Sequence, residues 1–235
     1  MITKTVKVTG AIVQNEDKWI YDWFEMDSTC ANDVEKALIE ANGEDVTIQI
    51  NSPGGDIGAG NEIAYHISQY KGKTTADIMG YCCSAATLPA CAANKSRMSP
   101  SALFMIHNVS GGDNGDYRDL AHTSDVLKTA SEAISKTYQQ KTGMSESELL
   151  KMMDEETWLN ATQAKEKGFV DEIIGETKTM SLYNTAPNVI LSDEVKNKIR
   201  NQIKNPNSND ADLDFLIQKN QALANLNLLK LKGEQ

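Results

Sequence analysis

The segment VTIQINSPGG at residues 46–55 decides the fold class, because a short strand pattern runs directly into a Pro-Gly-Gly turn at residues 53–55. A helical pattern follows at about residues 57–70, and a second strand pattern occupies residues 73–79. Successive strand–helix–strand units pair their strands in parallel through right-handed crossovers. The sequence therefore predicts an α/β fold built on a mainly parallel sheet.

Further elements of the same kind flank this unit on both sides. Apolar periodicity predicts strands at residues 6–13, 102–106 and 169–174, and helices at residues 33–41, 84–93 and 117–140. Ser145 with Glu148, and Asn160 with Gln163, have capping-box spacing and predict two more helix starts. Residues 1–178 are therefore expected to form one domain.

The composition changes after about residue 179, and we expect a C-terminal helical extension over residues 179–235. Residues 201–209 are rich in Asn and contain Pro206, which is typical of a linker. Residues 211–231 carry an apolar seam interrupted by two asparagines, which suits a short coiled coil. A marginal amphipathic helix, docked on a neighbour or partly disordered, is the alternative.

Composition also excludes several classes of function. The 235 residues are 40% hydrophobic, enough for one sizeable core, and the net charge of −10 disfavours a nucleic-acid partner. No apolar run approaches the ~18 residues that span a bilayer. The N-terminus lacks the apolar core of a signal peptide. We expect a soluble, cytoplasmic protein with no membrane partner, no metal and no organic cofactor.

Four cysteines are present, and none forms a C-x-x-C pair. This usage indicates free, buried thiols in a reducing compartment rather than a disulfide framework. The residues are Cys30, Cys82, Cys83 and Cys91.

A serine and a histidine stand close to the ends of two predicted strands. Ser84 lies between the strand at residues 73–79 and a small-residue helix, and His107 ends the strand at residues 102–106. A serine hydroxyl becomes a nucleophile when a base takes its proton, and strand ends hold such groups rigidly beside substrate. Each residue alone also fits a structural role: Ser84 as a helix cap or packing residue, and His107 as an ordinary strand-end histidine.

The two strand-to-helix turns offer backbone donors for an oxyanion. A tetrahedral intermediate needs at least two fixed N–H groups, and Gly55 and Ala85 supply one from each turn. Glycine lets the backbone approach a substrate closely, and a helix start directs N–H groups at an anion. A plain tight turn is the alternative interpretation of Gly54-Gly55. Nucleophile, base and donors together predict acyl transfer on a peptide by a serine peptidase.

Three motifs, in the same order, make residues 48–108 resemble the proteolytic subunit of the Clp protease. They are NSPGG at residues 51–55, GYCCS at residues 80–84 and MIHN at residues 105–108. Thr142-Gly143 and GFVDEI at residues 168–173 match two further landmarks, so the resemblance covers about residues 8–175. It implies the superfold shared by Clp proteases and crotonase-like enzymes, with mainly parallel sheets, flanking helices and one long protruding helix.

The resemblance also implies a role for each candidate site residue. Ser84 would be the nucleophile and His107 the general base and acid. Gly55 and Ala85 would be the oxyanion donors. Gly54 and Asn108 would contact the substrate.

The acidic member of the site is an Asp in the family. Counting without a gap from Gly143 forward or from Gly168 backward leads to Glu156 in this chain. A Glu can orient the imidazole in the same way, as in some convergent triads. Asp154 is the fallback, and a Ser–His dyad without an acid is the third possibility.

Departures from the housekeeping subunit resemble the Clp-like head-maturation, or prohead, proteases of tailed phages and prophages. Ser84 is followed by Ala85-Ala86-Thr87 rather than Met-Gly-Ala, and the loop at residues 111–115 is short and acidic. The segment before Val8 is short, and the C-terminal extension is additional. The implied protein is a serine endopeptidase for phage capsid or scaffold proteins. It would act as a homo-oligomeric ring or stacked rings in the host cytoplasm or the prohead.

Three other functions remain open. The chain could form a proteolytic chamber served by an ATP-dependent unfoldase, which must be a separate chain because no P-loop motif occurs here. It could be a crotonase-like acyl-CoA enzyme, in which two backbone N–H groups hold a thioester enolate. It could also be an inactive scaffolding ring. The presence of a Ser–His pair at the matching positions argues against the last two.

Overall fold

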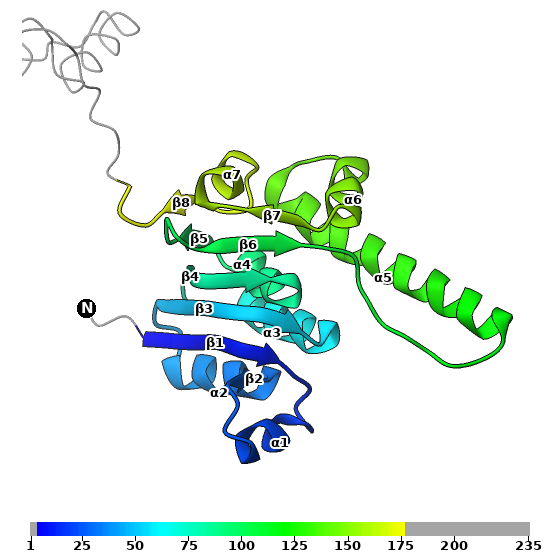
Figure 1. Cartoon of the computed structure of the whole chain (residues 1–235). Coiled ribbons are helices and arrows are strands. Elements are labelled where there is room, and N and C mark those ends of the chain that lie inside the picture. The colour runs from blue at the N-terminus through cyan, green and yellow to red at the C-terminus, as the bar shows by residue number, and fades with distance from the viewer. Residues whose placement is uncertain (1–3, 177–235) are drawn as a thin grey trace, which may run out of the picture. The chain divides into compact units, whose positions relative to one another are not determined.

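An eight-stranded sheet forms the centre of the computed structural model, which describes residues 4–176. The strand order is β2-β1-β3-β4-β5-β8, with β6 beside β4 and β7 beside β6 (Figure 1). The strands are β1 (Lys4–Ile12), β2 (Ser28–Thr29), β3 (Val46–Gly55), β4 (Thr74–Cys83), β5 (Lys95–Met98), β6 (Leu103–Ile106), β7 (Thr157–Leu159) and β8 (Glu172–Ile173). Within residues 4–176 every pairing is parallel except that of β6 with β7.

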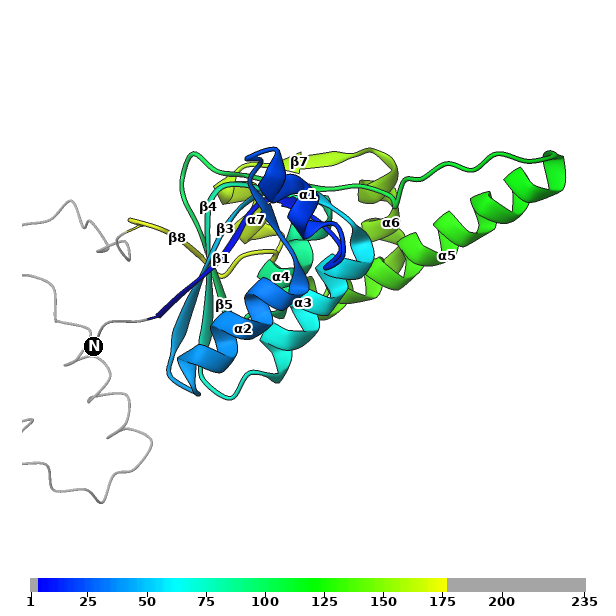
Figure 2. The same ribbon diagram turned by 90° about the horizontal axis from the view of Figure 1, so that it is seen from below.

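Seven α-helices and one short 3₁₀ turn, η1 (Ser84–Ala86), accompany the sheet in the described part of the chain. The helices are α1 (Lys18–Trp23), α2 (Ala31–Ala41), α3 (Ile57–Gln69), α4 (Thr87–Ala92), α5 (Tyr117–Thr142), α6 (Glu146–Asp154) and α7 (Ala161–Glu166). Figure 2 shows α2 and α3 side by side on one face of the sheet. Their apolar stripes, among them Val34, Leu38 and Ile63, are fully or almost fully buried there. The predicted α/β fold, mainly parallel sheet and long helix are confirmed.

Two predicted strand ends are wrong, since β3 continues through the Pro-Gly-Gly segment to Gly55 and β4 continues to Cys83. The ladder between β3 and β4 shifts register between Ile50 and Ser52. The Asn51 side chain bridges that irregularity, because its Oδ1 accepts a hydrogen bond from Tyr81 N at 2.9 Å. A β-bulge of this kind bends and twists a strand without ending it.

Beyond this bulge, β4 changes its neighbour. Residues 75–78 pair with β5, whereas residues 81–83 pair with β6. The change brings the end of β6, and with it His107, beside the end of β4. The parallel arrangement of β3, β4 and β6 thus collects three strand ends at one edge of the sheet.

The long helix α5 is attached to the rest of the domain through its C-terminal half. Its 26 residues begin at a capping box formed by Asp116 and Asp119 and end at Gly143, whose φ is +73°. All of its buried residues lie between Ser131 and Tyr138. Figures 1 and 2 show the N-terminal half extending away from the sheet.

The predicted helical extension at residues 179–235, with its linker at 201–209 and coiled coil at 211–231, lies outside the described residues. Within residues 4–176, no helix combines the length and the apolar character needed to cross a bilayer.

Asp171, in the GFVDEI segment, joins the end of the domain to β5 and α5. Its Oδ2 accepts hydrogen bonds from Ser96 N at 2.7 Å, Ser96 Oγ at 3.0 Å and Lys141 Nζ at 2.8 Å. Burial acts to raise the pKa of Asp171, but the bonds from Lys141 and Ser96 outweigh it, so the pKa is lower than its ordinary value. The charged carboxylate is therefore the form that holds these elements together.

We predict that Asp171→Asn lowers the free energy of unfolding at pH 7 by about 1 kcal/mol, because solvent screens this partly exposed carboxylate. A depressed native pKa gives stability that is present above the unfolded pKa of about 3.9 and lost as the pH falls through the native value. Urea unfolding should show a difference from wild type at pH 7 that shrinks below about pH 4. Asp125→Asn, on the exposed part of α5, is the control and should show no difference. A difference independent of pH would contradict this account.

Candidate functional site

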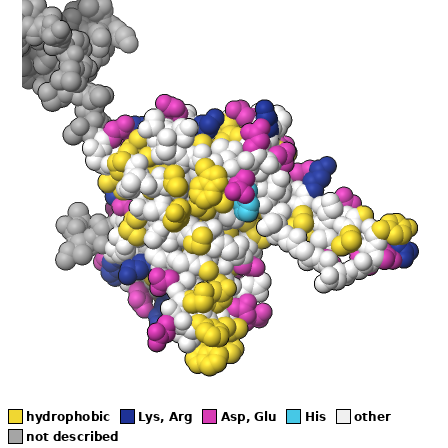
Figure 3. Space-filling view, viewed as in Figure 1, with side chains coloured by type: hydrophobic (Ala, Val, Ile, Leu, Met, Phe, Trp, Pro, Cys, Tyr) yellow, Lys and Arg dark blue, Asp and Glu magenta, His cyan; other side chains and the backbone are white. Residues whose placement is uncertain are grey.

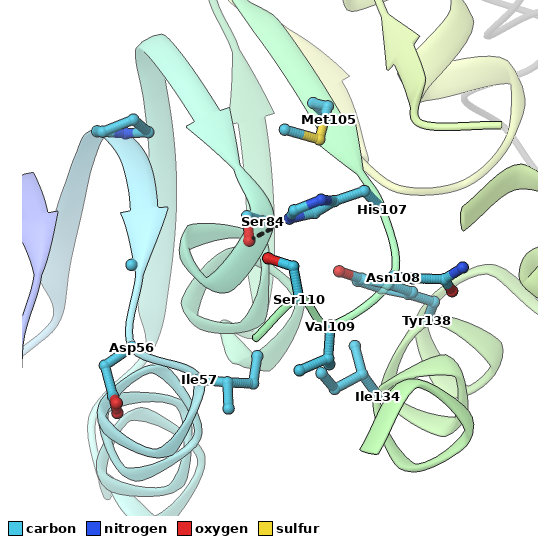
Figure 4. Close-up of a pocket in the computed structure, with 12 residues that line it drawn as sticks. Asp56, Ile57, Ser84, Met105, His107, Asn108, Val109, Ser110, Ile134 and Tyr138 are labelled. Atoms are coloured by element: carbon cyan, nitrogen blue, oxygen red, sulfur yellow. Dashed lines mark hydrogen bonds between the residues drawn. The ribbon is translucent and has the colours of Figure 1, made fainter. Parts of the chain in front are cut away.

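Ser84 stands immediately after β4, in a backbone conformation that few serines adopt. Its φ is +54°, in the left-handed region, and it opens the turn η1. Such a conformation costs a non-glycine residue on the order of 1–3 kcal/mol and persists where the surroundings enforce it. The turn directs the hydroxyl away from the sheet and into a cavity (Figure 4).

The imidazole of His107 meets this hydroxyl. His107 follows directly on β6, and Cys83 and Met105 are partners in the β4–β6 ladder, so the two residues come from neighbouring strand ends. His107 Nε2 lies 2.7 Å from Ser84 Oγ (Figure 4). In the neutral tautomer that carries its proton on Nδ1, Nε2 accepts the Ser84 O–H, which is the geometry a general base requires.

The pair opens onto a cavity of about 380 Å³. Its walls combine the polar pair with apolar side chains from α3, α5 and the loop after β6. The lining residues are Pro53, Gly55, Asp56, Ile57, Ser84, Met105, His107, Asn108, Val109, Ser110, Ile134 and Tyr138. The cavity therefore presents both polar and apolar groups next to the Ser84 hydroxyl.

The Gly54-Gly55 pair packs directly against neighbouring backbone. Gly54 has a φ of +97°, and a Cβ at this position would lie 2.6 Å from Cys83 O and 2.8 Å from Ser84 Cβ. A Cβ at Gly55 would lie 2.1 Å from Ile12 O in β1. Only glycine fits at either place, so the motif is required by close approach and not merely by a turn. Gly55 lines the cavity, and Ala85 is fully buried next to Ser84.

The two candidate acids are both engaged away from His107 in this structure. Glu156 Oε1 accepts a hydrogen bond from Trp158 Nε1 at 3.1 Å, and Asp154 Oδ1 accepts one from Asn108 Nδ2 at 2.8 Å. Within residues 4–176, neither carboxylate makes a hydrogen bond to the imidazole. Asn108 lines the cavity, but its side-chain amide is directed at Asp154.

A chain of hydrogen bonds that no sequence pattern indicates ends on the backbone of Ser84. Thr87 Oγ1 donates to Ser84 O at 2.6 Å, and the Tyr138 hydroxyl lies 2.7 Å from Thr87 Oγ1. The sequence predicts Tyr138 only as part of the helix at residues 117–140, since nothing in its spacing indicates a partner 51 residues away.

The neighbouring cysteines take no part in hydrogen bonding to the Ser–His pair. Cys83 is buried, and burial raises its pKa to about 11. All four cysteines are free, as predicted, although Cys91 is only partly buried. In the described residues no group of three or more His, Cys, Asp or Glu side chains is placed to hold a metal ion.

A serine hydroxyl bonded to an imidazole, beside two strand-to-helix turns, is the arrangement found in serine hydrolases. Comparison with known proteins places the fold in one family of such enzymes. A profile of the Clp protease family matches residues 6–177. The chain therefore belongs to the Clp protease family and is related to its peptidase subunits.

Individual relatives agree with this assignment. The chain is 31% identical over 140 residues to the ATP-dependent Clp protease proteolytic subunit 3 of Rhizobium etli, covering 59% of this chain and 72% of the relative. It is 31% identical over 156 residues to proteolytic subunit 1 of Streptomyces avermitilis, covering 64% and 72%. A solved structure of a ClpP1 mutant from Listeria monocytogenes superposes with a TM-score of 0.61 at 28% identity, covering 73% of this chain and 91% of that one.

We predict that Gly54→Ala abolishes turnover, because the added methyl group would displace the Ser84 turn, and lowers the free energy of unfolding by about 2 kcal/mol or more. Gly43→Ala is the matched control, since Gly43 also has a positive φ, +82°, but its Cβ would meet nothing within 4 Å. It should cost only about 1–2 kcal/mol of left-handed strain and leave activity intact. Peptide hydrolysis assays and urea unfolding of both variants check this, and an active Gly54→Ala protein would contradict it.

Proposed function

We propose that the chain is a serine endopeptidase in which Ser84 is the nucleophile and His107 the general base and acid. The observation that carries the proposal is the 2.7 Å contact between Ser84 Oγ and His107 Nε2 at the mouth of a cavity. His107 takes the hydroxyl proton as Oγ bonds to the carbonyl carbon of the substrate. The protonated imidazole then gives that proton to the leaving amine as the peptide C–N bond breaks. A water molecule hydrolyses the acyl-enzyme by the same route in reverse.

We assign the oxyanion contacts to the backbone N–H groups of Gly55 and Ala85. Gly55 lines the cavity and Ala85 follows the nucleophile directly, so the two groups come from turns that face the same space. Donors fixed in advance stabilise the charge that develops on the carbonyl oxygen, and one such donor is worth about 10²–10³ in kcat. Gly54 and Asn108 are proposed to contact the peptide on either side of this point.

We assign the third catalytic role to Glu156. In the antiparallel β6–β7 ladder Ile106 pairs with Thr157, and His107 and Glu156 are the residues next to this pair. Glu156 lies directly before β7 with a φ of +48°, so it belongs to the turn that leads into the strand. Rotation of the carboxylate away from Trp158 would bring it to the imidazole Nδ1. Asp154 is less suited, because it ends α6 and lies three residues before β7 rather than directly before it.

The active form is proposed to be a homo-oligomeric ring or a pair of stacked rings. Exposed apolar side chains gather over α1 and along the N-terminal half of α5, and Figure 3 shows both groups on one face. The exposed residues are Trp19, Trp23, Phe24 and Met26 in and after α1, and Tyr117, Leu120 and Val126 in α5. Burial of such surfaces between copies would stabilise an assembly. A sedimentation mass equal to one chain at working concentration would contradict this.

The substrate we propose is a phage capsid or scaffold protein, processed in the host cytoplasm or the prohead. Support comes from the sequence departures around Ser84 and from the short, acidic loop before α5. A chamber served by a separate unfoldase is the second candidate, because the relatives are named as ATP-dependent subunits. Cleavage of a capsid protein by the purified chain alone would favour the first function, and cleavage only with an added ATPase the second.

A fluorophosphonate probe tests the peptidase directly. We predict a covalent adduct at Ser84 in the assembled protein, mapped by mass spectrometry of the digested chain. Ser84→Ala should prevent labelling and lower kcat by at least about 10⁴-fold, and His107→Ala should have a similar effect, since the two residues act as a unit. His66→Ala, in α3 and outside the cavity lining, is the control and should label normally. Absence of an adduct in the wild-type assembly would instead favour the crotonase-like enzyme or the inactive ring.

The acid is tested by two isosteric substitutions. Glu156→Gln should lower kcat by about 10³- to 10⁴-fold with little change in KM, because the imidazole loses the partner that orients it and stabilises its charged form. Asp154→Asn should lower kcat less than about threefold. Steady-state kinetics on one peptide substrate compares them. A larger loss of kcat in Asp154→Asn than in Glu156→Gln would assign the third catalytic role to Asp154. Full activity of both variants would indicate a Ser–His dyad.

A further inference from the structure

The hydrogen-bonded chain behind Ser84 ends on the carbonyl oxygen of the nucleophile itself. A carbonyl oxygen only accepts, so in the 2.6 Å contact between Thr87 Oγ1 and Ser84 O the threonine is the donor. The single hydroxyl proton of Thr87 is engaged in this bond. The 2.7 Å contact between Thr87 Oγ1 and the Tyr138 hydroxyl must therefore have Tyr138 as its donor. The protons of both hydroxyls point in one direction, toward the Ser84 carbonyl.

That carbonyl belongs to the same peptide unit as the N–H of Ala85. The unit is planar and trans, so the Ser84 oxygen and the Ala85 hydrogen point in opposite directions. A group that fixes the oxygen from behind also fixes where the N–H points in front. The backbone N–H of Thr87 reaches the same oxygen, and the Thr87 hydroxyl adds a second donor.

The orientation of the Ser84–Ala85 peptide depends on its neighbours, because the backbone of Ser84 is strained. Ser84 is held at a φ of +54°, a region that is unfavourable for a residue with a Cβ. Relaxation of that strain would rotate the Ser84–Ala85 peptide and move its N–H. The backbone of β3 runs close to this peptide, since a Cβ at Gly54 would lie 2.6 Å from Cys83 O and 3.1 Å from Ala85 N. The Thr87 hydroxyl holds the carbonyl oxygen of the same peptide, and Tyr138 holds Thr87.

Tyr138 is suited to act as a permanent hydrogen-bond donor in a fixed position. Tyr138 is 1% exposed, and its ring packs edge-on against Phe169 with centroids 5.7 Å apart. Burial raises the pKa of Tyr138 above its ordinary value, although the bond to Thr87 acts to lower it, so the hydroxyl keeps its proton at neutral pH. The residue also belongs to α5, so the nucleophile turn is joined to the long helix.

We propose that Thr87 and Tyr138 are positioning residues that orient the Ser84–Ala85 peptide and thereby aim the Ala85 N–H at the oxyanion. The proposal rests on the function proposed above. It makes the Ala85 contact depend on a hydroxyl of α5 that does not touch the reacting atoms.

Tyr138→Phe removes the hydroxyl and keeps the ring. Since complete loss of an oxyanion donor costs about 10²–10³ in kcat, a displaced donor should lower kcat about tenfold with KM unchanged. The inhibition constant of a peptidyl boronate, which mimics the tetrahedral adduct, should rise by a similar factor. Thr87→Val should show the same changes, because valine lacks the hydroxyl. Thr87→Ser keeps the hydroxyl and should have the wild-type kcat and inhibition constant. The double variant, Thr87→Val with Tyr138→Phe, should be no worse than the more impaired single variant.

Tyr70→Phe is the matched control, since it also loses one tyrosine hydrogen bond, to Glu44 O at 2.7 Å, away from the site. It should leave kcat, KM and boronate inhibition unchanged. Equal kcat and equal boronate inhibition in wild type and Tyr138→Phe would overturn the positioning role while leaving the peptidase intact.

A second measurement does not depend on activity. Crystal structures of wild type and Tyr138→Phe should show the Ser84–Ala85 peptide rotated in the variant. A peptide in the same orientation in both structures would overturn the positioning role, whatever the activity of the protein. Failure of the wild-type protein to label at Ser84 would instead count against the proposed function alone.

Discussion

The close approach of β3 to the turn that carries Ser84 is the contact on which the rest of the site depends. Gly54 has no side chain, so its backbone can lie against Cys83 O and Ala85 N. Asn51 supports the approach from within the sheet by bonding to the backbone of Tyr81 where the ladder is irregular. Because β3, β4 and β6 run in parallel, their carboxyl ends meet at one edge, where open α/β sheets commonly bind ligands. The positions of the site residues thus depend on the parallel direction of these three strands and on the absence of a side chain at Gly54.

Much of this could be predicted from the sequence, and the reasons differ between elements. Residues 46–55 and 102–106 have strong local patterns, and Ser84 and His107 come at or just after strand ends, so a parallel sheet brings them together. The strand β5 contains a single apolar residue, Met98, and β7 is only three residues long, so neither has an apolar pattern of its own and both exist through their pairing partners. The bond between Thr87 and Tyr138 joins residues far apart in the chain, and no local signal marks it.

The candidate acids show a second limit on what the sequence can predict, the direction of an exposed side chain. Spacing leads to Glu156, which lies directly before β7 and next to the Ile106–Thr157 pair, but the rotamer depends on which donor the carboxylate meets. Here the donor is the indole of Trp158, and Asp154 is satisfied by Asn108. Backbone position is encoded by the ladder, whereas the direction of a long, exposed side chain is decided by small differences among local hydrogen bonds. Exposed carboxylates of this kind are therefore the least predictable members of a catalytic group.

The burial of Cys83 beside Ser84 has a consequence for redox chemistry. Thiolates, not thiols, react with alkylating agents and peroxides, and a pKa of about 11 leaves almost no thiolate at neutral pH. The sulfur atom of Cys83 therefore reacts slowly, although it is adjacent in sequence to the proposed nucleophile. Iodoacetamide and mild oxidants would leave this position unmodified, so the surroundings of Ser84 would stay unchanged under conditions that modify exposed thiols.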